Sequence, residues 1–285
     1  MTEESSFDRS PSESEVHARH ESNRAGWNEG AQQYTEKIAS TVAFISQGKS
    51  NLHPIERQNL GDLRTWCRTA IHLQCASGKD TLSLLNEGVE EVIGVDISDV
   101  HIANAYQTTT ELEKAGYPVK ARWMRCDVLD TPHWLDGWAD LVYTGRGALC
   151  WLHDMDRYAG VVARLLKPGG VYHVLDDHPV TNLFDNEAST YVLRGAGYFD
   201  KCEESVGWPS TYIGDLPGIP IDKQSVKYER NWTLAEITKA LIGAGLAVEY
   251  LGEHVEPYWN RFPNLRADLK GIIPLTFSIK ARKVY

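Results

Sequence analysis

The stretch from Ala70 to Ser98 constrains the fold of this 285-residue chain more than any other part of it. A short apolar run ends at Leu73 and is followed by a turn of small residues. An amphipathic segment then ends at Gly88, and a second apolar run leads into Asp96. This order indicates a strand, a tight turn, a helix and a second strand, which together form a βαβ unit.

The turn of this unit has the composition of a nucleoside-binding site. Ser77 and Asp80 stand three positions apart, as in a capping box, and Gly78 allows a ligand to approach the backbone closely. The N-terminus of the helix then faces the cleft and favours a carboxylate or a phosphate. Asp96 follows Gly78 by 18 positions and ends the second strand, where a carboxylate can accept both ribose hydroxyls. We therefore expect a ligand with an anionic end and a ribose in its middle.

Two nucleoside cofactors have this structure, a dinucleotide and S-adenosylmethionine (SAM). A dinucleotide turn follows the pattern G-x-G-x-x-G, because its pyrophosphate lies against the backbone. Here Gln74 and Ala76 occupy the first two glycine positions, and only Gly78 remains. This departure disfavours a pyrophosphate. A βαβ unit that binds no ligand is a further interpretation of the same residues.

The sequence of this turn resembles that of a known enzyme family. Residues 73–82, Leu-Gln-Cys-Ala-Ser-Gly-Lys-Asp-Thr-Leu, and residues 94–98, Gly-Val-Asp-Ile-Ser, are similar to class I SAM-dependent methyltransferases. Their closest likeness is to the subgroup with Leu-Gln-Cys-x-x-Gly-x-Asp-Thr-Leu in place of the glycine-rich turn. The resemblance covers about residues 20–285 and is specific for fold and cofactor. Within that subgroup the chain also looks like the C-methyltransferases of teleocidin-type indole alkaloid pathways.

The resemblance implies SAM as the cofactor and S-adenosylhomocysteine (SAH) as its product. The cofactor-binding residues that it implies are Trp27, Tyr34, Gln74, Ala76, Ser77, Gly78, Asp96, Ile97, Asp127, Val128 and Thr144. Asp127 follows a strand, where it can accept the adenine amino hydrogens. Some of these residues also have a structural interpretation, because Trp27 and Tyr34 can anchor their helix on the sheet and Asp127 can be a turn residue.

The composition disfavours several classes of protein. The chain is 42% hydrophobic and 24% charged, and none of its apolar runs approaches the roughly 18 residues of a membrane span. A net charge of −10 disfavours nucleic acid as a partner. The five cysteines have no C-x-x-C spacing, which argues against a disulfide framework and against a zinc site. We expect a cytoplasmic protein without a metal, whose partner is a small-molecule acceptor.

The chain divides into three regions. Residues 1–14 are polar and without periodicity, so we expect a disordered tail. Residues 15–69 are predicted to form an N-terminal helical lid, helical from Glu15 to Ile45, and a connector. Residues 70–285 are predicted to form a Rossmann-like, doubly wound α/β core with a seven-stranded sheet, an insertion at 180–231 after the fifth strand, and a C-terminal antiparallel hairpin. Because an N-terminal helix can exchange between subunits, we expect a homo-oligomer.

The C-terminal region carries clear local signals. Thr233 and Glu236 form the capping box of a helix that stops at Gly243. In the last strand, apolar residues at 275, 277, 279 and 281 alternate with polar ones, the pattern of a half-exposed edge strand. A final antiparallel hairpin is typical of SAM methyltransferases and not of NAD-binding domains.

The aromatic, glycine-rich insertion is predicted to cap the acceptor pocket. The candidate acceptor-binding residues are Trp151, His178, Tyr198, Phe199, Trp208 and Tyr212. His178, Asp177 and His153 are candidate proton acceptors, although none is assigned as catalytic. His178 can equally be a polar wall of the pocket, and many of the aromatic residues can belong to the core.

Methyl transfer from a sulfonium needs alignment of the reacting atoms and exclusion of water more than a catalytic side chain. A hydroxyl or amine acceptor requires a base, whereas a carbon acceptor becomes cationic and is stabilised by aromatic faces. The aromatic insertion and the resemblance predict a SAM-dependent methyltransferase of secondary metabolism that acts on an apolar natural product. The sharpest form of this prediction is C-methylation of the terpenoid (prenyl) chain of an indole alkaloid. The alternatives are O- or N-methylation of another small molecule, an NAD-dependent reductase and a non-catalytic subunit with this fold.

Overall fold

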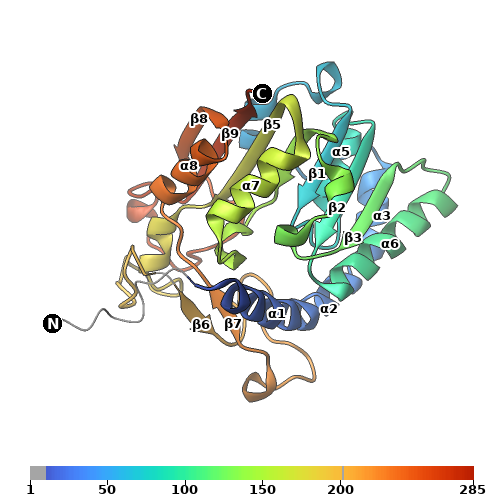
Figure 1. Cartoon of the computed structure of the whole chain (residues 1–285). Helices are drawn as coiled ribbons and strands as arrows, with labels where there is room; N and C mark the ends of the chain where they lie inside the picture. The colour runs from blue at the N-terminus through green and yellow to red at the C-terminus, as the bar shows by residue number, and fades with distance from the viewer. Residues whose placement is uncertain (1–10, 201) are drawn as a thin grey trace.

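A seven-stranded sheet lies at the centre of the computed structural model, which describes residues 11–200 and 202–285. Its strands follow the order β3-β2-β1-β4-β5-β9-β8 (Figure 1). Their bounds are β1 Thr69–Leu73, β2 Glu91–Asp96, β3 Ala121–Arg125, β4 Ala139–Thr144, β5 Leu166–Asp177, β8 Leu246–His254 and β9 Thr276–Lys283. The first five strands are parallel, and β9 runs antiparallel to both β5 and β8. The predicted Rossmann-like α/β fold with a C-terminal hairpin is confirmed.

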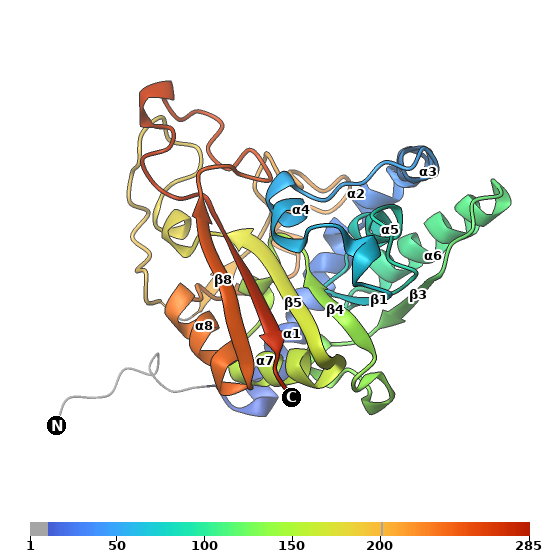
Figure 2. The same cartoon turned by 90° about the horizontal axis from the view of Figure 1, so that it is seen from above.

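Helices cover both faces of this sheet, with α7 and α8 on one side and α4 and α5 on the other (Figures 1 and 2). Their bounds are α4 Pro54–Leu60, α5 Lys79–Asn86, α6 Asp99–Lys114, α7 Met155–Leu165 and α8 Leu234–Gly243. The predicted capping box of Thr233 and Glu236 starts α8. Short 3-10 helices are η1 Leu63–Thr65, η2 Val128–Asp130, η3 His133–Leu135, η4 Leu149–Trp151, η5 Pro179–Leu183, η6 Ile221–Lys223 and η7 Ala267–Leu269.

The core is divided by the sheet because successive strand residues point to opposite faces. In β1, Ile71 joins a cluster with Tyr158 of α7, whereas its neighbour Ala70 joins a cluster with Leu60 of α4. A buried sheet of this kind fixes the carboxyl ends of β1, β2 and β4 beside one another. The candidate site lies at that edge.

The last strand is not at the edge of the sheet, so that prediction was wrong. β9 lies between β5 and β8, and β8 is the edge strand, with Tyr250 exposed on it. Two of the polar residues that alternate through β9, Thr276 and Ser278, are buried and have internal partners. Thr276 Oγ1 donates to Glu256 O at 2.9 Å, and Ser278 Oγ accepts from Asn59 Nδ2 at 2.8 Å. A hydroxyl that is hydrogen-bonded internally can occupy an interior strand, and alternation alone does not reveal this.

The N-terminal region forms three helices, α1 Glu13–Gly30, α2 Gln32–Thr35 and α3 Ile38–Ser46, where a single helical stretch was expected. A capping box of Ser12 and Glu15 starts α1, two residues before the predicted boundary. The rest of the expected tail, residues 1–10, lies outside the described part of the chain. α1 crosses the end of the sheet and lies next to β7 (Figure 1).

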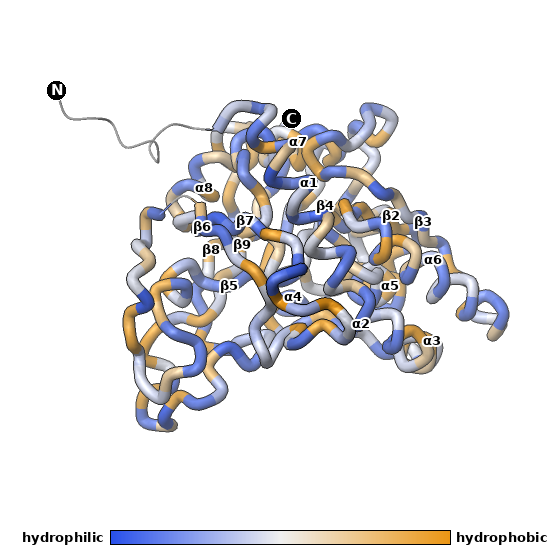
Figure 3. The backbone as a smooth tube through the Cα atoms, turned by 90° about the horizontal axis from the view of Figure 1, so that it is seen from below, coloured by the Kyte–Doolittle hydropathy of each residue, from blue (hydrophilic) through white to orange (hydrophobic). Residues whose placement is uncertain are grey.

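The insertion after β5 is largely irregular. Its only regular pairing in the described residues joins β6 (Glu203–Ser205) to β7 (Lys227–Glu229) in a separate antiparallel sheet. Hydrophobic and hydrophilic residues alternate along the loops at the lower left of Figure 3, beyond the labels of β8 and β5. Among the helices of residues 11–200 and 202–285, none combines the length and apolarity needed to cross a membrane.

Candidate active site

The turn after β1 has the backbone of a glycine-rich loop without its glycines. Gln74 and Ala76 have φ values of 58° and 45°, a left-handed conformation that is uncommon for residues with a side chain. Gly78 follows with φ 82° and is the N-cap of α5, without a side-chain capping bond. The turn therefore reproduces the glycine-loop geometry at a cost in backbone strain, at the edge where the parallel strands end.

The predicted capping box at this helix does not form, so that prediction was wrong. Ser77 Oγ is hydrogen-bonded to His101 Nδ1 at 2.8 Å, and Asp80 Oδ2 accepts from Arg146 Nη2 at 2.6 Å. Both side chains thus tie the turn to neighbouring elements. Gly78 also has a packing role, since a Cβ at this position would overlap the ring of Trp123.

A cavity of about 90 Å³ opens between this turn and α1. The structure brings several predicted cofactor residues together at its wall: Trp27, Gln74, Ala76, Asp96, Ile97, Asp127 and Val128. The other four predicted residues do not line it. Tyr34 lies behind the wall with its ring 5.2 Å from that of His101, and Thr144 Oγ1 is bonded to Tyr158 Oη at 2.5 Å in the core.

Asp96 is buried and held rigidly at the end of β2. Its Oδ2 accepts the Ala76 N–H at 2.8 Å, and its Oδ1 accepts the Ser98 N–H at 2.8 Å. Burial raises the pKa of Asp96 to about 6, although these backbone donors oppose the rise. A carboxylate has about four acceptor sites, so Asp96 can still accept a hydroxyl group from a ligand in the cleft.

The far end of this cleft is closed by α1. His20 Nε2 accepts the His153 N–H at 3.2 Å, so the ring proton lies on Nδ1, which donates to Asp127 Oδ2 at 2.7 Å. Asp127 Oδ1 also accepts the Leu129 N–H at 2.9 Å. Burial opposes ionisation of Asp127, but the bonds from His20 and Leu129 bring its pKa below the ordinary value. His20 was not predicted as a site residue, because nothing in the periodicity of α1 distinguishes it.

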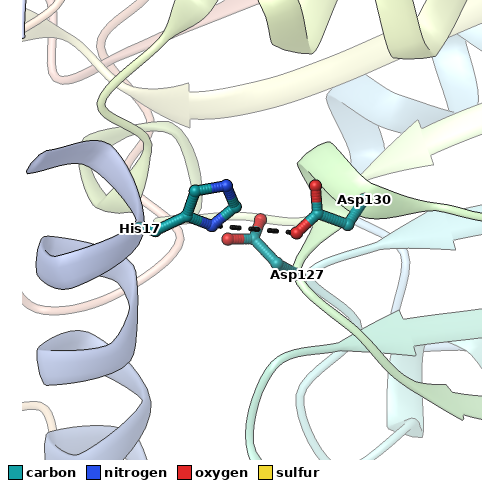
Figure 4. A group of neighbouring side chains, drawn as sticks. All are labelled: His17, Asp127 and Asp130. Atoms are coloured by element: carbon teal, nitrogen blue, oxygen red, sulfur yellow. Dashed lines mark ion pairs between the residues drawn. The ribbon is translucent and has the colours of Figure 1, made fainter. Parts of the chain in front are cut away.

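A second group of contacts joins α1 to η2 near the same place. His17 lies beside Asp127 and Asp130, with its Nδ1 3.8 Å from Asp130 Oδ2 (Figure 4). Arg157 Nη2 donates to Asp130 Oδ1 at 2.7 Å and supplies positive charge to these carboxylates. Together these contacts hold the N-terminal helix over the cleft.

Two buried polar atoms at the cleft wall have no partner among the described residues. They are Gln74 Oε1 and His101 Nε2. Gln74 Nε2 donates to Ala148 O at 2.7 Å, which fixes the amide orientation and leaves Oε1 as an acceptor. Burial lowers the pKa of His101 to about 3, so its ring is neutral. The methionyl part of SAM has an ammonium group that can donate to Gln74, and its ribose has polar atoms that can bond to His101. These residues therefore fit the cofactor.

Arg146 brings positive charge to the same wall. Its Nη1 donates to Asn51 O at 3.0 Å and lies 3.4 Å from Glu56 Oε2, and Asp80 holds the other nitrogen. Burial raises the pKa of Glu56, against the charge of Arg146, and Tyr143 Oη donates to Glu56 Oε1 at 2.6 Å. The loop after β4 was placed at the site from the sequence, but its arginine was not singled out.

A larger cavity of about 630 Å³ adjoins the cofactor cleft. Three residues, Gly147, Trp151 and Tyr212, line both cavities and mark where they meet. Most of the rest of its wall comes from the end of β5, the insertion after it and the loop between β8 and β9, which contributes Tyr258 and Trp259. That last loop was not expected to contribute to the cap.

Four aromatic side chains gather where the cavities meet, and we call them the aromatic junction: Trp27, Trp151, Trp208 and Tyr212. The ring of Trp27 lies 4.6 Å from that of Trp208, 5.3 Å from that of Trp151 and 6.4 Å from that of Tyr212. The Trp151 and Trp208 rings are 5.9 Å apart. Aromatic faces in this arrangement exclude water and attract positive charge.

Asp176 anchors the backbone of this junction. Its carboxylate accepts the N–H groups of Gly147, Ala148 and Leu149 at 2.8, 3.1 and 2.8 Å. Burial and the neighbouring Asp177 raise the pKa of Asp176 to about 6, against these donors. The carboxylate thus sets the path of the loop between the cavities, a role that residue type and position alone do not reveal.

Two of the three candidate bases, His178 and Asp177, have their side chains engaged by the protein. His178 Nδ1 accepts the Val180 N–H at 3.1 Å, its Nε2 is 2.7 Å from Glu253 Oε1, and it lines neither cavity. Asp177 lines the larger cavity but accepts from Arg261 Nη1 at 2.8 Å.

His153 also lines neither cavity, and burial lowers its pKa to about 3. Among the predicted acceptor residues, Trp151, Trp208 and Tyr212 lie at the large cavity. Tyr198 and Phe199 do not, and Phe199 is 79% exposed.

Residues 71–174 match the family model described as a methyltransferase domain. That segment covers the turn, Asp96, Asp127 and the loop after β4. The comparison thus joins the cofactor cleft to methyltransferase domains, and SAM is supported as the cofactor. In sequence, no curated protein matches the chain.

Solved structures of similar fold include several methyltransferases. A SAM-dependent methyltransferase from Mesorhizobium loti is 23% identical, with a TM-score of 0.55 over 80% of this chain and 96% of that one. Geranyl diphosphate C-methyltransferase from Streptomyces coelicolor A3(2), solved with SAH, is 15% identical with a TM-score of 0.52 over 88% and 84%. The [4+2]-cyclase SpnF is 16% identical with a TM-score of 0.51 over 89% and 94%. At these identities the likeness shows the fold.

Proposed function

We propose that this chain is a SAM-dependent methyltransferase that transfers a methyl group to carbon in a small, apolar natural product. The specific acceptor we propose is the terpenoid (prenyl) chain of an indole alkaloid of secondary metabolism. The observation that carries this proposal is the aromatic junction, which stands between the cofactor cleft and a cavity of about 630 Å³. A C-methyltransferase of a prenyl substrate among the structures of similar fold supports it as an analogy.

In such a reaction the residues of the cofactor cleft bind SAM, and those of the larger cavity bind the acceptor. When bound, SAM supplies a methyl group that is activated by the positive charge of its sulfonium. Asp96, Gln74 and His101 would hold the nucleoside and amino-acid parts in the cleft. The indole faces at the junction exclude water and face the charge that an alkene carbon develops when it is methylated.

The state of the candidate bases favours a carbon acceptor over oxygen or nitrogen. Removal of a proton from a hydroxyl or amine needs a base within hydrogen-bond reach. His178 and His153 line neither cavity, and Asp177 is paired with Arg261. An alkene requires no proton removal before methylation, so the attack does not depend on these three side chains. The cation that forms then loses a proton, for which carboxylates such as Glu229 stand in the wall of the larger cavity.

Incubation with methyl-labelled SAM and a prenylated indolactam tests this function. We expect one methyl group to be incorporated and located on a prenyl carbon by NMR, with the same indolactam lacking the prenyl chain as the matched control. Incorporation on oxygen or nitrogen would contradict C-methylation. No incorporation, together with measured SAH binding, would contradict the proposed acceptor and leave a SAM-binding protein of another activity.

A further inference from the structure

Lys227 in β7 is a buried cation at the wall of the larger cavity, only 2% exposed. Its Nζ donates to Gly207 O at 2.6 Å and lies 4.5 Å from the centroid of the Trp208 ring. In residues 11–200 and 202–285 no carboxylate forms an ion pair with it, whereas the three arginines of the same wall each have one: Arg194 with Glu203, Arg230 with Glu236 and Arg261 with Asp177.

An ammonium in this position is costly for the folded protein. Moving a charge out of water without a counter-charge is unfavourable, and burial lowers the pKa of Lys227, although Glu229 and Glu29 oppose this at longer range. One carbonyl oxygen satisfies only one of its three N–H donors. The stability of the fold alone gives no reason for a lysine here.

The packing around this side chain is nevertheless shaped to hold it. A Cβ at Gly26 of α1 would stand 2.7 Å from Lys227 Cγ and 2.9 Å from Cδ, so only glycine at that position leaves room for the stem. The stem therefore lies against the N-terminal helix, and its end is directed to Trp208 of the aromatic junction.

Among the buried side-chain atoms of the cavity wall that have no partner in the described residues, donors outnumber acceptors. Trp208 Nε1, Arg230 Nε and Arg261 Nε are buried donors without a partner among the described residues, and Asn186 Oδ1 is the corresponding acceptor. The N–H groups of Lys227 that have no acceptor add to this excess of donors. The excess favours a ligand that supplies acceptor oxygens.

We propose that Lys227 is a specificity-determining residue that binds a carbonyl or carboxylate oxygen of the methyl acceptor. The acceptor is then amphiphilic, with an apolar chain at the aromatic junction and an sp² oxygen at Lys227. Trp208 links the two positions, because one indole faces both Lys227 and Trp27. This inference rests on the proposed function in that it takes the larger cavity as the acceptor site.

Ligand preference tests the proposal without turnover. The SAH-loaded protein is titrated by tryptophan fluorescence with four probes of one C10 skeleton: geranic acid, geranamide, geranylamine and 2,6-dimethylocta-2,6-diene. We expect the acid, the amide or both to bind about tenfold more tightly than the diene and the amine. A preference for the acid identifies a carboxylate, and one for the amide identifies a carbonyl.

Two variants assign this preference to the lysine. Lys227→Met should remove the preference for an oxygen, and Lys227→Gln, which keeps an N–H donor but loses the charge, should remove any preference for the acid over the amide. Both should leave binding of the diene unchanged, whereas Lys223→Met, at a 73% exposed side chain, should change nothing. Equal affinity for all four probes, or a preference that survives both variants, would overturn the proposal.

Thermal unfolding separates ligand binding from a structural role. Because Lys227 is buried at a cost, Lys227→Met should leave the melting temperature unchanged or raise it. A fall in melting temperature would mean that the lysine serves the fold, and it would contradict the proposal. Failure of the proposed function would instead appear as absent methyl incorporation while the oxygen preference persists, so the two failures are distinguishable.

Discussion

The indole rings of Trp27 and Trp208 lie with their centroids 4.6 Å apart, which joins the N-terminal helix to the cap above the cofactor cleft. At the other end of the cleft, His20 of the same helix donates to Asp127. The helix α1 is thus fixed at both ends of the site by residues far away in sequence. The helix α1 thus covers a cleft of about 90 Å³.

The indole of Trp27 is predicted to contribute directly to cofactor affinity. Trp27→Leu should weaken SAH binding about tenfold in calorimetry, because the substitution opens the wall of the cleft to water. Trp134→Leu is the matched control, because that indole is 57% exposed and lines neither cavity. Equal SAH affinity in the two variants would show that α1 covers the cleft without binding the cofactor.

The aromatic junction, and not a base, is predicted to govern turnover. With prenylated indolactam as acceptor, Trp151→Leu should lower kcat/KM by more than about tenfold, and Trp151→Phe should retain most of it because an aromatic face remains. His178→Asn should change kcat/KM by less than about threefold, since both of its ring nitrogens are bonded within the protein. A large loss of kcat/KM on substitution of His178 would instead favour transfer to oxygen or nitrogen.

A side chain at Gly94 is predicted to destabilise the fold, because Gly94 packs directly against Trp123. A Cβ at position 94 would stand 2.5 Å from Trp123 Cε3, so Gly94→Ala should lower the free energy of unfolding by roughly 1–3 kcal/mol. When Trp123 is already replaced by leucine, the same Gly94→Ala substitution should lower the free energy of unfolding by less, because the ring that the new Cβ would meet is absent.

Gly160→Ala is the matched control for this substitution, because nothing lies within 4 Å of a Cβ there and the residue is in the middle of α7. It should raise stability by up to about 1 kcal/mol in urea unfolding. If both alanine variants behave alike, the account of Trp123 packing is contradicted.

Acid is predicted to destabilise the fold through its buried neutral histidines. Burial lowers the pKa of His72 to about 4 and that of His101, His153 and His173 to about 3. Below the unfolded-state pKa of about 6.5, these histidines bind protons in the unfolded chain but not in the folded one. The stability that they contribute is therefore present above that pH and is lost as pH falls. Asp96 and Asp176, whose pKa burial raises to about 6, act in the opposite sense but are fewer.

Urea unfolding at several pH values between 7.5 and 5 measures this effect. His173→Leu should show a shallower loss of stability, by up to about 1.4 kcal/mol per pH unit, than the unmodified chain. His133→Leu, at an 86% exposed side chain, should leave the slope unchanged. An unchanged slope in His173→Leu would show that this histidine does not couple folding to pH.

The opening βαβ unit and the position of the cofactor cleft could be predicted because they follow from local pattern. The apolar runs ending at Leu73 and Asp96 and the breaks between them determine a βαβ unit, and parallel strands bring their carboxyl ends together. Trp27 and Asp127 were also placed at the cleft, on resemblance. These residues lie in or beside elements whose register is set by a buried sheet.

The rest of the site depends on contacts that local pattern does not encode. His20, His101 and Arg146 line the cleft through pairings with residues 24 to 107 positions away, and no spacing in their own elements marks them. Lys227 lies in a short strand of an irregular insertion, where periodicity carries no information. The capping box at Ser77 failed because Arg146 and His101 compete for the same side chains.

The central claim is that the strained turn and the carboxylate of Asp96 bind the cofactor, and calorimetric titration with SAH tests it most directly. We predict that the unmodified chain binds SAH, that Asp96→Asn weakens binding by at least about tenfold, and that Asp99→Asn, in the exposed first turn of α6, does not. Absence of SAH binding by the unmodified chain, or equal affinity in Asp96→Asn, would contradict the claim.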